Sequence, residues 1–262
     1  MAVVDNSETS VFSESWFWLG SGRGQGDCRW FILLQMFKKG KAWGRATKAF
    51  CEDITQASGA LSSCNSYWEG KAAILELKDA DYNWRQMEWW AFYFEYKAMC
   101  LRNVGFSMPG EKFNSVVFDA TRNVNWDLKA KAVKSDNHLA ILNDVRAMNE
   151  SARQRGEHGV MLALCDVEYN DEHRTFQRWH TELKGGASKY ERERQARTSL
   201  SRYRKTNARM SEILFLRFTV DDLSVLPQMR QGRNSNGRPR PPKYMLDLEE
   251  SVELIAGRLI FP

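Results

Sequence analysis

The sequence predicts an α/β (α+β) fold, with a mixed central sheet flanked by helices and a further helical layer at the N-terminus. Residues 28–101 show apolar side chains at helical spacing, and strand-like segments follow at residues 115–133, 158–169 and 212–220. Helical patterns separate these strands, which favours a sheet covered by helices. No repeat of solenoid or propeller period occurs, so we expect one domain over residues 1–262.

The N-terminal part is predicted to be helical. Residues 28–60 carry apolar side chains three and four apart, which indicates two helices separated by the segment KKGK. A further helix is expected over residues 67–101, broken or bent near residues 79–82. Its second half is apolar nearly all round, as in a helix buried inside a domain. The glycine-rich segment at 20–27 lacks a GK[ST] ending and is expected to be a linker.

Two glutamates interrupt this apolar helix. Glu88 and Glu95 are seven residues apart, so they project from nearly the same side of a helix. Carboxylates on such a helix are costly unless something pairs with them. We expect that this side reaches solvent, that Arg or Lys partners satisfy it, or that it faces a catalytic centre.

The segment VVFDATRNVNWDLKAKAV, residues 116–133, predicts a hairpin. Its β-branched and aromatic residues favour two antiparallel strands at residues 115–120 and 124–133, joined by the turn-forming ATRN. Side chains alternate along a strand, so Asp127, Lys129 and Lys131 are expected on one face, and Trp126 and Leu128 on the other.

The remaining elements are predicted in order. An amphipathic helix is expected over residues 137–153, then a central apolar strand at 158–169 and a helix over 171–183 that Gly185 and Gly186 end. A basic helix at 189–208, a strand at 212–220, a Pro/Gly/Arg-rich loop at 228–244 and a helix at 246–260 follow. We divide the chain into an N-terminal helical region (1–78), a core (79–185) and a basic C-terminal region (186–262).

Composition limits the possible locations and site types. No apolar run approaches the roughly 20 residues of a membrane span, and the N-terminus lacks a signal-peptide pattern, which favours the cytoplasm. The five cysteines and four histidines show no zinc or disulfide spacing. Neither a GxSxG nucleophile elbow nor a GxxxxGK[ST] loop occurs, which disfavours serine-triad and P-loop chemistry.

The positive charge is clustered. Although the formal net charge is only +5, residues 185–217 carry nine Lys/Arg against three acids, and residues 227–243 carry five against none. Such clusters indicate a polyanionic partner such as nucleic acid. The alternative is a solvated helix face followed by a surface loop.

The charges of the hairpin suit metal-assisted phosphodiester chemistry. Two carboxylates, Asp119 and Asp127, would form the oxygen-rich site that Mg²⁺ prefers. Lys129, two residues after the second acid, would lie beside them and could orient or help deprotonate a water, or offset charge on a phosphate.

This arrangement resembles the PD-(D/E)xK nuclease superfamily, which includes the type II restriction endonucleases. The match is VVFD ending in Asp119, seven intervening residues, and Asp127-Leu128-Lys129, with Phe118 at the family's usual proline. The resemblance covers roughly residues 83–169. It implies a restriction-endonuclease-like fold, Asp119 and Asp127 as metal ligands, and Lys129 as a catalytic residue. It also implies a glutamate on the preceding helix, for which Glu88 is our first choice and Glu95 the second.

The implied function is a Mg²⁺-dependent, sequence-specific double-stranded DNA endonuclease of the type II restriction kind. A symmetric cut would call for a homodimer. We expect the basic helix to follow the DNA backbone and the Arg-rich loop to read bases, because Arg contacts guanine and Asn contacts adenine. The expected DNA-binding residues are Arg197, Arg202, Arg204, Lys205, Arg230, Arg233, Asn234, Asn236 and Arg238.

Two alternatives share these features. A nuclease of the same superfamily that serves DNA repair, recombination or RNA processing would have the same site. A non-catalytic nucleic-acid-binding protein would use the basic segments and keep the hairpin as a solvated scaffold. In that case Asp127 and Lys129 would form an exposed ion pair that contributes about 0 to 1 kcal/mol.

Overall fold

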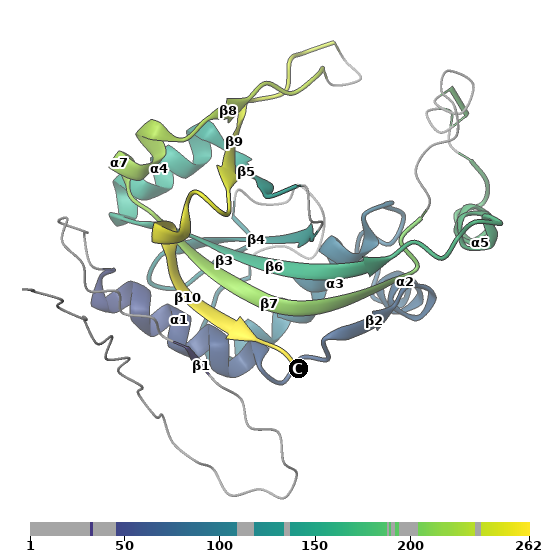
Figure 1. Cartoon of the computed structure of the whole chain (residues 1–262), viewed down its shortest axis with the longest axis horizontal. Helices are drawn as coiled ribbons and strands as arrows, with labels where there is room; N and C mark the ends of the chain where they lie inside the picture. The colour runs from purple at the N-terminus through teal and green to yellow at the C-terminus, as the bar shows by residue number, and fades with distance from the viewer. Residues whose placement is uncertain are drawn as a thin grey trace, which may run out of the picture.

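The structure of the protein is a computed structural model that describes residues 32–33, 46–108, 118–133, 137–187, 189, 192–193, 204–233 and 237–262. The described chain is a mixed α/β fold with a seven-stranded sheet and a three-stranded sheet (Figure 1). The mixed sheet flanked by helices that the sequence predicts is therefore confirmed at this level.

The larger sheet is built around two long antiparallel strands, β6 (His158–Glu168) and β7 (Asn207–Phe218). Beyond β6, β4 (Asn125–Ala132) runs parallel to it and pairs antiparallel with the short β3 (Ala120–Thr121). The other side of β7 pairs antiparallel with two strands, β2 and β10, and β1 pairs with β10. Their bounds are β1 (Ile32–Leu33), β2 (Tyr67–Glu69) and β10 (Ile255–Ile260).

The smaller sheet lies against the larger one and is antiparallel throughout. Its strand order is β5-β9-β8, with bounds β5 (Leu139–Asp144), β8 (Gln228–Met229) and β9 (Lys243–Asp247). The chain between β8 and β9 doubles back on itself, because Arg240 N donates to Gly232 O over 2.9 Å and Arg233 bridges to Pro239. We call residues 230–242 the β8–β9 arm.

Alternation along β6 creates a core on each face of the larger sheet. Met161 and Ala163 pack into the core with α1 (Lys48–Leu61), α2 (Gly70–Asp79), α3 (Trp89–Lys97) and the 3-10 helix η1 (Ala98–Val104). Val160 and Leu162 pack into the core with α4 (Val145–Arg155), α7 (Val220–Val225) and the smaller sheet. Figure 1 shows α1 below the larger sheet and α4 and α7 above it. A strand buried on both faces explains its continuous apolar sequence.

Several predicted elements are confirmed. The hairpin is present as β3 and β4, although the strand predicted at 115–120 is only Ala120–Thr121, and residues 115–117 lie outside the described residues. The apolar strand at 158–169 is the central β6, and α1 and α5 (Thr175–Leu183) are helices. Gly185 and Gly186 follow α5 with positive φ angles of 82° and 113°. The break or bend predicted near 79–82 is a break: α2 ends at Asp79, and Asp81 and Asn83 adopt φ angles of 50° and 40°.

Other predicted helices are wrong. Residues 139–144 form β5, whose burial alternates with period two at its start, so the helix predicted from residue 137 begins only at Val145. The helix predicted at 246–260 is instead the end of β9, the 3-10 helix η2 (Val252–Leu254) and β10. Short apolar runs fit the period of a helix as well as that of a strand. Residues 255–260 form a strand because they pair with β7, and residues 139–144 because they pair with β9.

The predicted N-terminal helices and basic helix are only partly described. Most of 28–45 lies outside the described residues, and Ile32–Leu33 form a strand rather than part of a helix. The helix predicted over 67–101 starts with β2 and is divided into α2, α3 and η1. The basic helix predicted to reach residue 208 does not, because residues 204–206 are irregular and β7 starts at Asn207.

Candidate functional site

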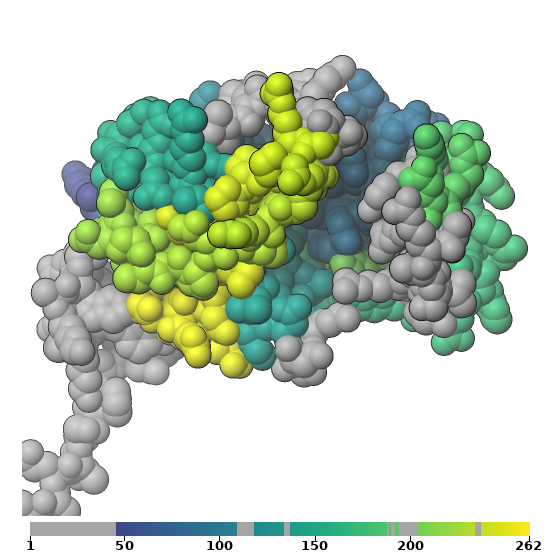
Figure 2. All heavy atoms as spheres, turned by 90° about the horizontal axis from the view of Figure 1, so that it is seen from above, coloured from purple at the N-terminus to yellow at the C-terminus, as the bar shows by residue number. Residues whose placement is uncertain are grey.

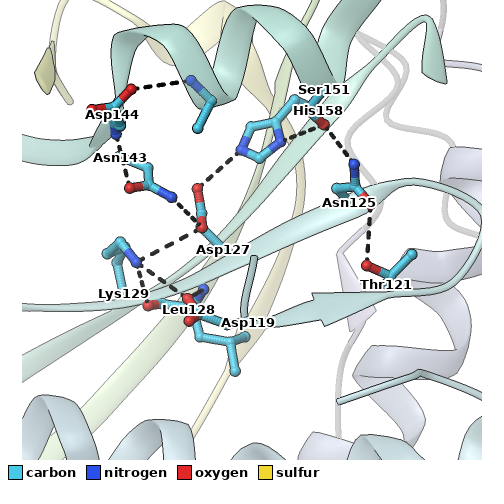
Figure 3. A network of polar contacts seen from close by, with 11 residues as sticks. Asp119, Thr121, Asn125, Asp127, Leu128, Lys129, Asn143, Asp144, Ser151 and His158 are labelled. Atoms are coloured by element: carbon cyan, nitrogen blue, oxygen red, sulfur yellow. Dashed lines mark hydrogen bonds and ion pairs between the residues drawn. The ribbon is translucent and has the colours of Figure 1, made fainter. Parts of the chain in front are cut away.

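The hairpin brings the two predicted aspartates together. Asp119 directly precedes β3, and its backbone N–H extends the ladder by donating to Trp126 O over 3.2 Å. Its side-chain Oδ2 accepts from the backbone N–H of Leu128 over 2.8 Å, next to Asp127 on the opposing strand. The carboxyl group of Asp119 is thereby fixed at the point where the second acid emerges from β4 (Figure 3).

Lys129 connects the two acids. Its Nζ lies 3.2 Å from Asp119 Oδ2 and 4.0 Å from Asp127 Oδ1, and it donates to Leu128 O over 3.0 Å. The side chain is 26% exposed, so the contact is neither a solvated surface pair nor fully enclosed. Burial opposes the charge, but Asp119, Asp127 and Glu95 raise the pKa of Lys129 above its usual range. Lys129 is therefore held as an ammonium group.

Asp127 is buried and hydrogen-bonded on both oxygens. Asn143 Nδ2 donates to Oδ1 over 2.8 Å, and His158 Nε2 lies 3.1 Å from Oδ2. Only 1% of the side chain is exposed. Burial disfavours ionisation, but Lys129, His158 and Asn143 hold the pKa of Asp127 below its usual value. A buried carboxylate with this many donors stays ionised.

The third carboxylate of the site is Glu95. It lies in α3, and its Oε2 accepts a hydrogen bond over 3.3 Å from Oη of Tyr82, which precedes that helix. Burial and the negative charge of Asp119 raise the pKa of Glu95 to about 7, while Lys129 opposes this rise. Glu95 is therefore within electrostatic range of Asp119 and Lys129, on the helix that packs against β4.

Glu88, our first choice for the helix glutamate, lies elsewhere. It precedes α3 as the N-cap residue, with φ −88° and ψ 47°, so it does not share a helical face with Glu95. Its carboxylate is 59% exposed and pairs with Lys205 Nζ over 3.0 Å. Of the two glutamates, Glu95 lies within α3 and Glu88 does not, because the helix begins one residue after Glu88.

Sequence reasoning missed three polar residues that surround the acids: Tyr82, Asn143 and His158. Each comes from a segment far from the hairpin in sequence, and none belongs to a motif. The only available signal was a histidine at the start of an apolar strand, where a polar residue is costly without a partner.

The predicted DNA-binding residues fall into three groups. Arg197, Arg202, Asn234 and Asn236 lie outside the described residues. Two basic residues of the predicted helix are engaged with the protein: Arg204 is 7% exposed, and Lys205 pairs with Glu88 and lies 3.2 Å from the centroid of the Trp90 ring. Exposed side chains in the β8–β9 arm are Arg230, Arg233 and Arg238.

The arm starts next to the acids. Lys243, the first residue of β9, pairs in register with Asp144, which follows Asn143. Burial and the nearby Lys129 lower the pKa of Lys243, whereas Asp127 and Asp144 oppose this change. The smaller sheet therefore brings a second lysine and the base of an arginine-bearing arm to the site. In Figure 2 the yellow segment that contains β9 rises above the surrounding surface.

The donor set suits Mg²⁺. Asp119 is 29% exposed, and its Oδ1 accepts no hydrogen bond from the part of the chain that the structure describes. Among the described residues, no three Asp, Glu, His or Cys side chains form a ready-made metal cluster. Mg²⁺ does not need three protein ligands, since it is commonly held by one or two carboxylates together with waters and substrate phosphates. Asp119 and Asp127 are the two carboxylates of the site that could serve in this way.

Comparison with known proteins gave no relative: no family model, curated protein or solved structure matches the chain. In the described ranges, none of the helices has the length and apolar character of a transmembrane span.

Proposed function

We propose that the protein is a Mg²⁺-dependent endonuclease that hydrolyses phosphodiester bonds in double-stranded DNA, in the manner of type II restriction enzymes. The observation that carries this proposal is the position of Lys129, whose ammonium group lies 3.2 Å from Asp119 across the hairpin and 4.0 Å from the buried Asp127 on its own strand. A solvated scaffold would not bury Asp127 to 1% exposure.

The order of elements supports the same proposal. α3 carries Glu95, and the β3–β4 hairpin that follows it carries Asp119, Asp127 and Lys129. α4 comes later in the chain and leads into β6, which pairs parallel with β4. A helix, a hairpin, a helix and a central strand are what the resemblance to PD-(D/E)xK nucleases implies. We infer that residues 89–168 form a restriction-endonuclease-like core.

In this proposal Asp119 and Asp127 hold the metal, and Glu95 completes their polar surroundings. When bound, Mg²⁺ would polarise the phosphoryl group and make a coordinated water more acidic. Lys129 Nζ keeps its protons, so it orients the attacking water and offsets negative charge on the phosphate rather than acting as the base. The arginines of the β8–β9 arm contact the DNA, and a symmetric cut would require two copies of the chain.

The test is incubation of the purified protein with long, unmethylated duplex DNA, in Mg²⁺ or in chelator. We expect discrete Mg²⁺-dependent fragments, and about a 100-fold or greater loss of rate in Asp119→Asn and Lys129→Ala. Lys131→Ala is the matched control for Lys129→Ala, because Lys131 lies two residues along β4 and contacts Leu139 O instead of the acids.

The two glutamates provide a second matched pair. Glu95→Gln should lower the cleavage rate, whereas Glu88→Gln should leave it unchanged. DNA that stays intact but is shifted in a gel by wild type and Lys129→Ala alike would overturn the proposal in favour of a non-catalytic binding protein. Mg²⁺-dependent cleavage that gives no discrete fragments would support the proposed nuclease activity but contradict the sequence specificity of a restriction enzyme.

A further inference from the structure

A buried histidine stands behind the second aspartate. His158 is the first residue of β6, has 0% exposure, and is paired in register with Asn125 of β4. Its Nε2 lies 3.1 Å from Asp127 Oδ2, and its Nδ1 lies 3.0 Å from Ser151 Oγ in α4 (Figure 3). An imidazole in such a position must form hydrogen bonds through both nitrogens to offset its burial.

The hydrogen bonds around His158 run in one direction. An ionised Asp127 only accepts, so His158 donates from Nε2, which leaves Nδ1 to accept from the Ser151 hydroxyl. Ser151 Oγ in turn accepts from Asn125 Nδ2 over 3.0 Å, and Asn125 Oδ1 accepts from Thr121 Oγ1 over 3.1 Å. This order of donors and acceptors suits the tautomer of a neutral imidazole that has its proton on Nε2, facing Asp127.

One further contact holds the ring, and another holds the carboxylate that it faces. The Phe118 ring packs on it with a centroid distance of 5.4 Å, in the position where the PD-(D/E)xK pattern has proline. From the other side of the carboxylate, Asn143 Nδ2 donates to Asp127 Oδ1, and Asn143 Oδ1 accepts from Asp144 N over 2.8 Å. Both oxygens of Asp127 are thereby oriented by groups from different elements, with Oδ1 on the side of Lys129.

We propose that His158 is a positioning residue, held by Ser151, that orients the Asp127 carboxylate for the divalent cation of the reaction. This inference rests on the proposed function, since it gives His158 a role at the same site. Groups that hydrogen-bond to a metal-binding carboxylate set its orientation, and removing one typically costs about 10- to 100-fold in metal affinity or activity.

Two substitutions separate the two nitrogens of the ring. The amide nitrogen of Gln can replace Nε2 and donate to Asp127, so His158→Gln keeps the contact that matters. Asn is shorter, so its amide replaces Nδ1, and His158→Asn loses the donor to Asp127. His180→Asn is the matched control, because His180 is also buried, at 1% exposure, but contacts Trp84 O.

The first measurement is Mn²⁺ affinity, by calorimetry on the full chain, with unfolding temperature in chelator recorded for each variant. We expect His158→Asn to weaken Mn²⁺ binding about 10- to 100-fold. His158→Gln should recover most of the affinity, and His180→Asn should bind Mn²⁺ as the wild type does even if it unfolds at lower temperature. In cleavage assays His158→Asn should lower kcat, with a smaller effect on the KM for DNA.

If His158→Asn does not fold, Ser151→Ala tests the same inference, because it removes the donor that holds Nδ1. It should weaken Mn²⁺ binding less than His158→Asn would. The inference about His158 would be overturned if the folded variants bind Mn²⁺ as tightly as the wild type, or if His158→Asn and His158→Gln weaken Mn²⁺ binding equally. The proposed function would still stand in either case if the wild type cleaves DNA. A wild type that neither binds Mn²⁺ nor cleaves DNA would reject both.

Discussion

Three carboxylates share Lys129, and the protein gives each a different environment. Asp127 has donors on both oxygens and a lowered pKa, whereas Glu95 accepts a hydrogen bond from Tyr82 and has a pKa raised to about 7. Burial raises the pKa of both, but the neighbouring charges differ: Lys129 and then His158 lower the pKa of Asp127, whereas Asp119 raises that of Glu95 further. At neutral pH, Asp127 is ionised, and Glu95 is close to its midpoint.

Glu95 makes stability depend on pH. Its pKa is 4.5 in the reference state and about 7 in the folded protein, so the folded state binds more protons between these values and stability falls as pH rises through this window. The neighbouring charges are Asp119, Asp127 and Lys129. The lowered pKa of Asp127 acts at more acidic pH and does not offset this loss.

Glu95→Gln should therefore have nearly wild-type stability at pH 5 and exceed it at pH 8. The gain should be at most about 3 kcal/mol, because one pKa unit corresponds to about 1.4 kcal/mol. Denaturant unfolding in chelator at pH 5, 6, 7 and 8 measures this difference. A constant difference between the two proteins across the range would show that Glu95 does not titrate in this window.

At the scale of elements, the hairpin is anchored by another buried acid. Asp53 of α1 has 0% exposure, and its carboxylate accepts from Arg122 Nη1 over 2.8 Å and from Trp126 Nε1 over 3.0 Å. It also accepts from the backbone N–H groups of Asn123 and Val124 in the turn. One side chain thus joins α1 to the turn that sets the register of β3 and β4.

Asp53→Ala should destabilise the protein by about 3 to 5 kcal/mol, because it leaves the partly buried Arg122 and several turn donors without their acceptor. Denaturant unfolding measures the change in free energy. The control is Glu52→Ala: its ion pair with Lys48 joins side chains that are 50% and 93% exposed and should contribute less than about 0.5 kcal/mol. Similar stabilities for the two variants would contradict the anchoring role of Asp53.

At the scale of the whole molecule, the site lies where the two sheets meet. The larger sheet contributes Asp127 and Lys129 from β4 and His158 from β6, while the smaller sheet contributes Asn143 from β5 and Lys243 from β9. The β8–β9 arm extends from this junction. A DNA strand at the acids would therefore lie within reach of the arm.

Arg230→Ala and Arg233→Ala should each weaken DNA binding. If an arginine contacts a phosphate, affinity falls for all sequences, and the slope of log K against log salt becomes smaller by about 1. If it contacts a base, preference at one position of the target is lost at a cost of about 1 to 3 kcal/mol.

Gel-shift titrations in chelator at several salt concentrations measure both effects. Lys48→Ala is the control, since Lys48 is 93% exposed on α1, on the opposite side of the larger sheet from the arm in Figure 1. Equal salt slopes for the wild type and both arginine variants, with no change in affinity, would exclude the arm from the DNA interface.

The sequence by itself determined the parts of the protein that depend on local period and turn chemistry. Alternation predicted that Asp127 and Lys129 share a face. The ATRN segment placed the turn of the hairpin only approximately, because Ala120 and Thr121 form β3 and the turn spans residues 122–124. A continuous apolar run predicted the central strand β6, and the spacing of apolar residues predicted α1. These features follow from neighbouring residues, so one chain segment contains the whole signal.

Only the tertiary structure decided the features that need a partner distant in sequence. Residues 139–144 and 255–260 became strands because β9 and β7 offered unpaired backbone groups, which outweighed a helical pattern. Glu95 reached the site, and Glu88 did not, because α3 begins after Glu88 and packs against β4. Asn143 and His158 surround Asp127 for the same reason: a buried charge requires donors, and the fold brings them from other strands.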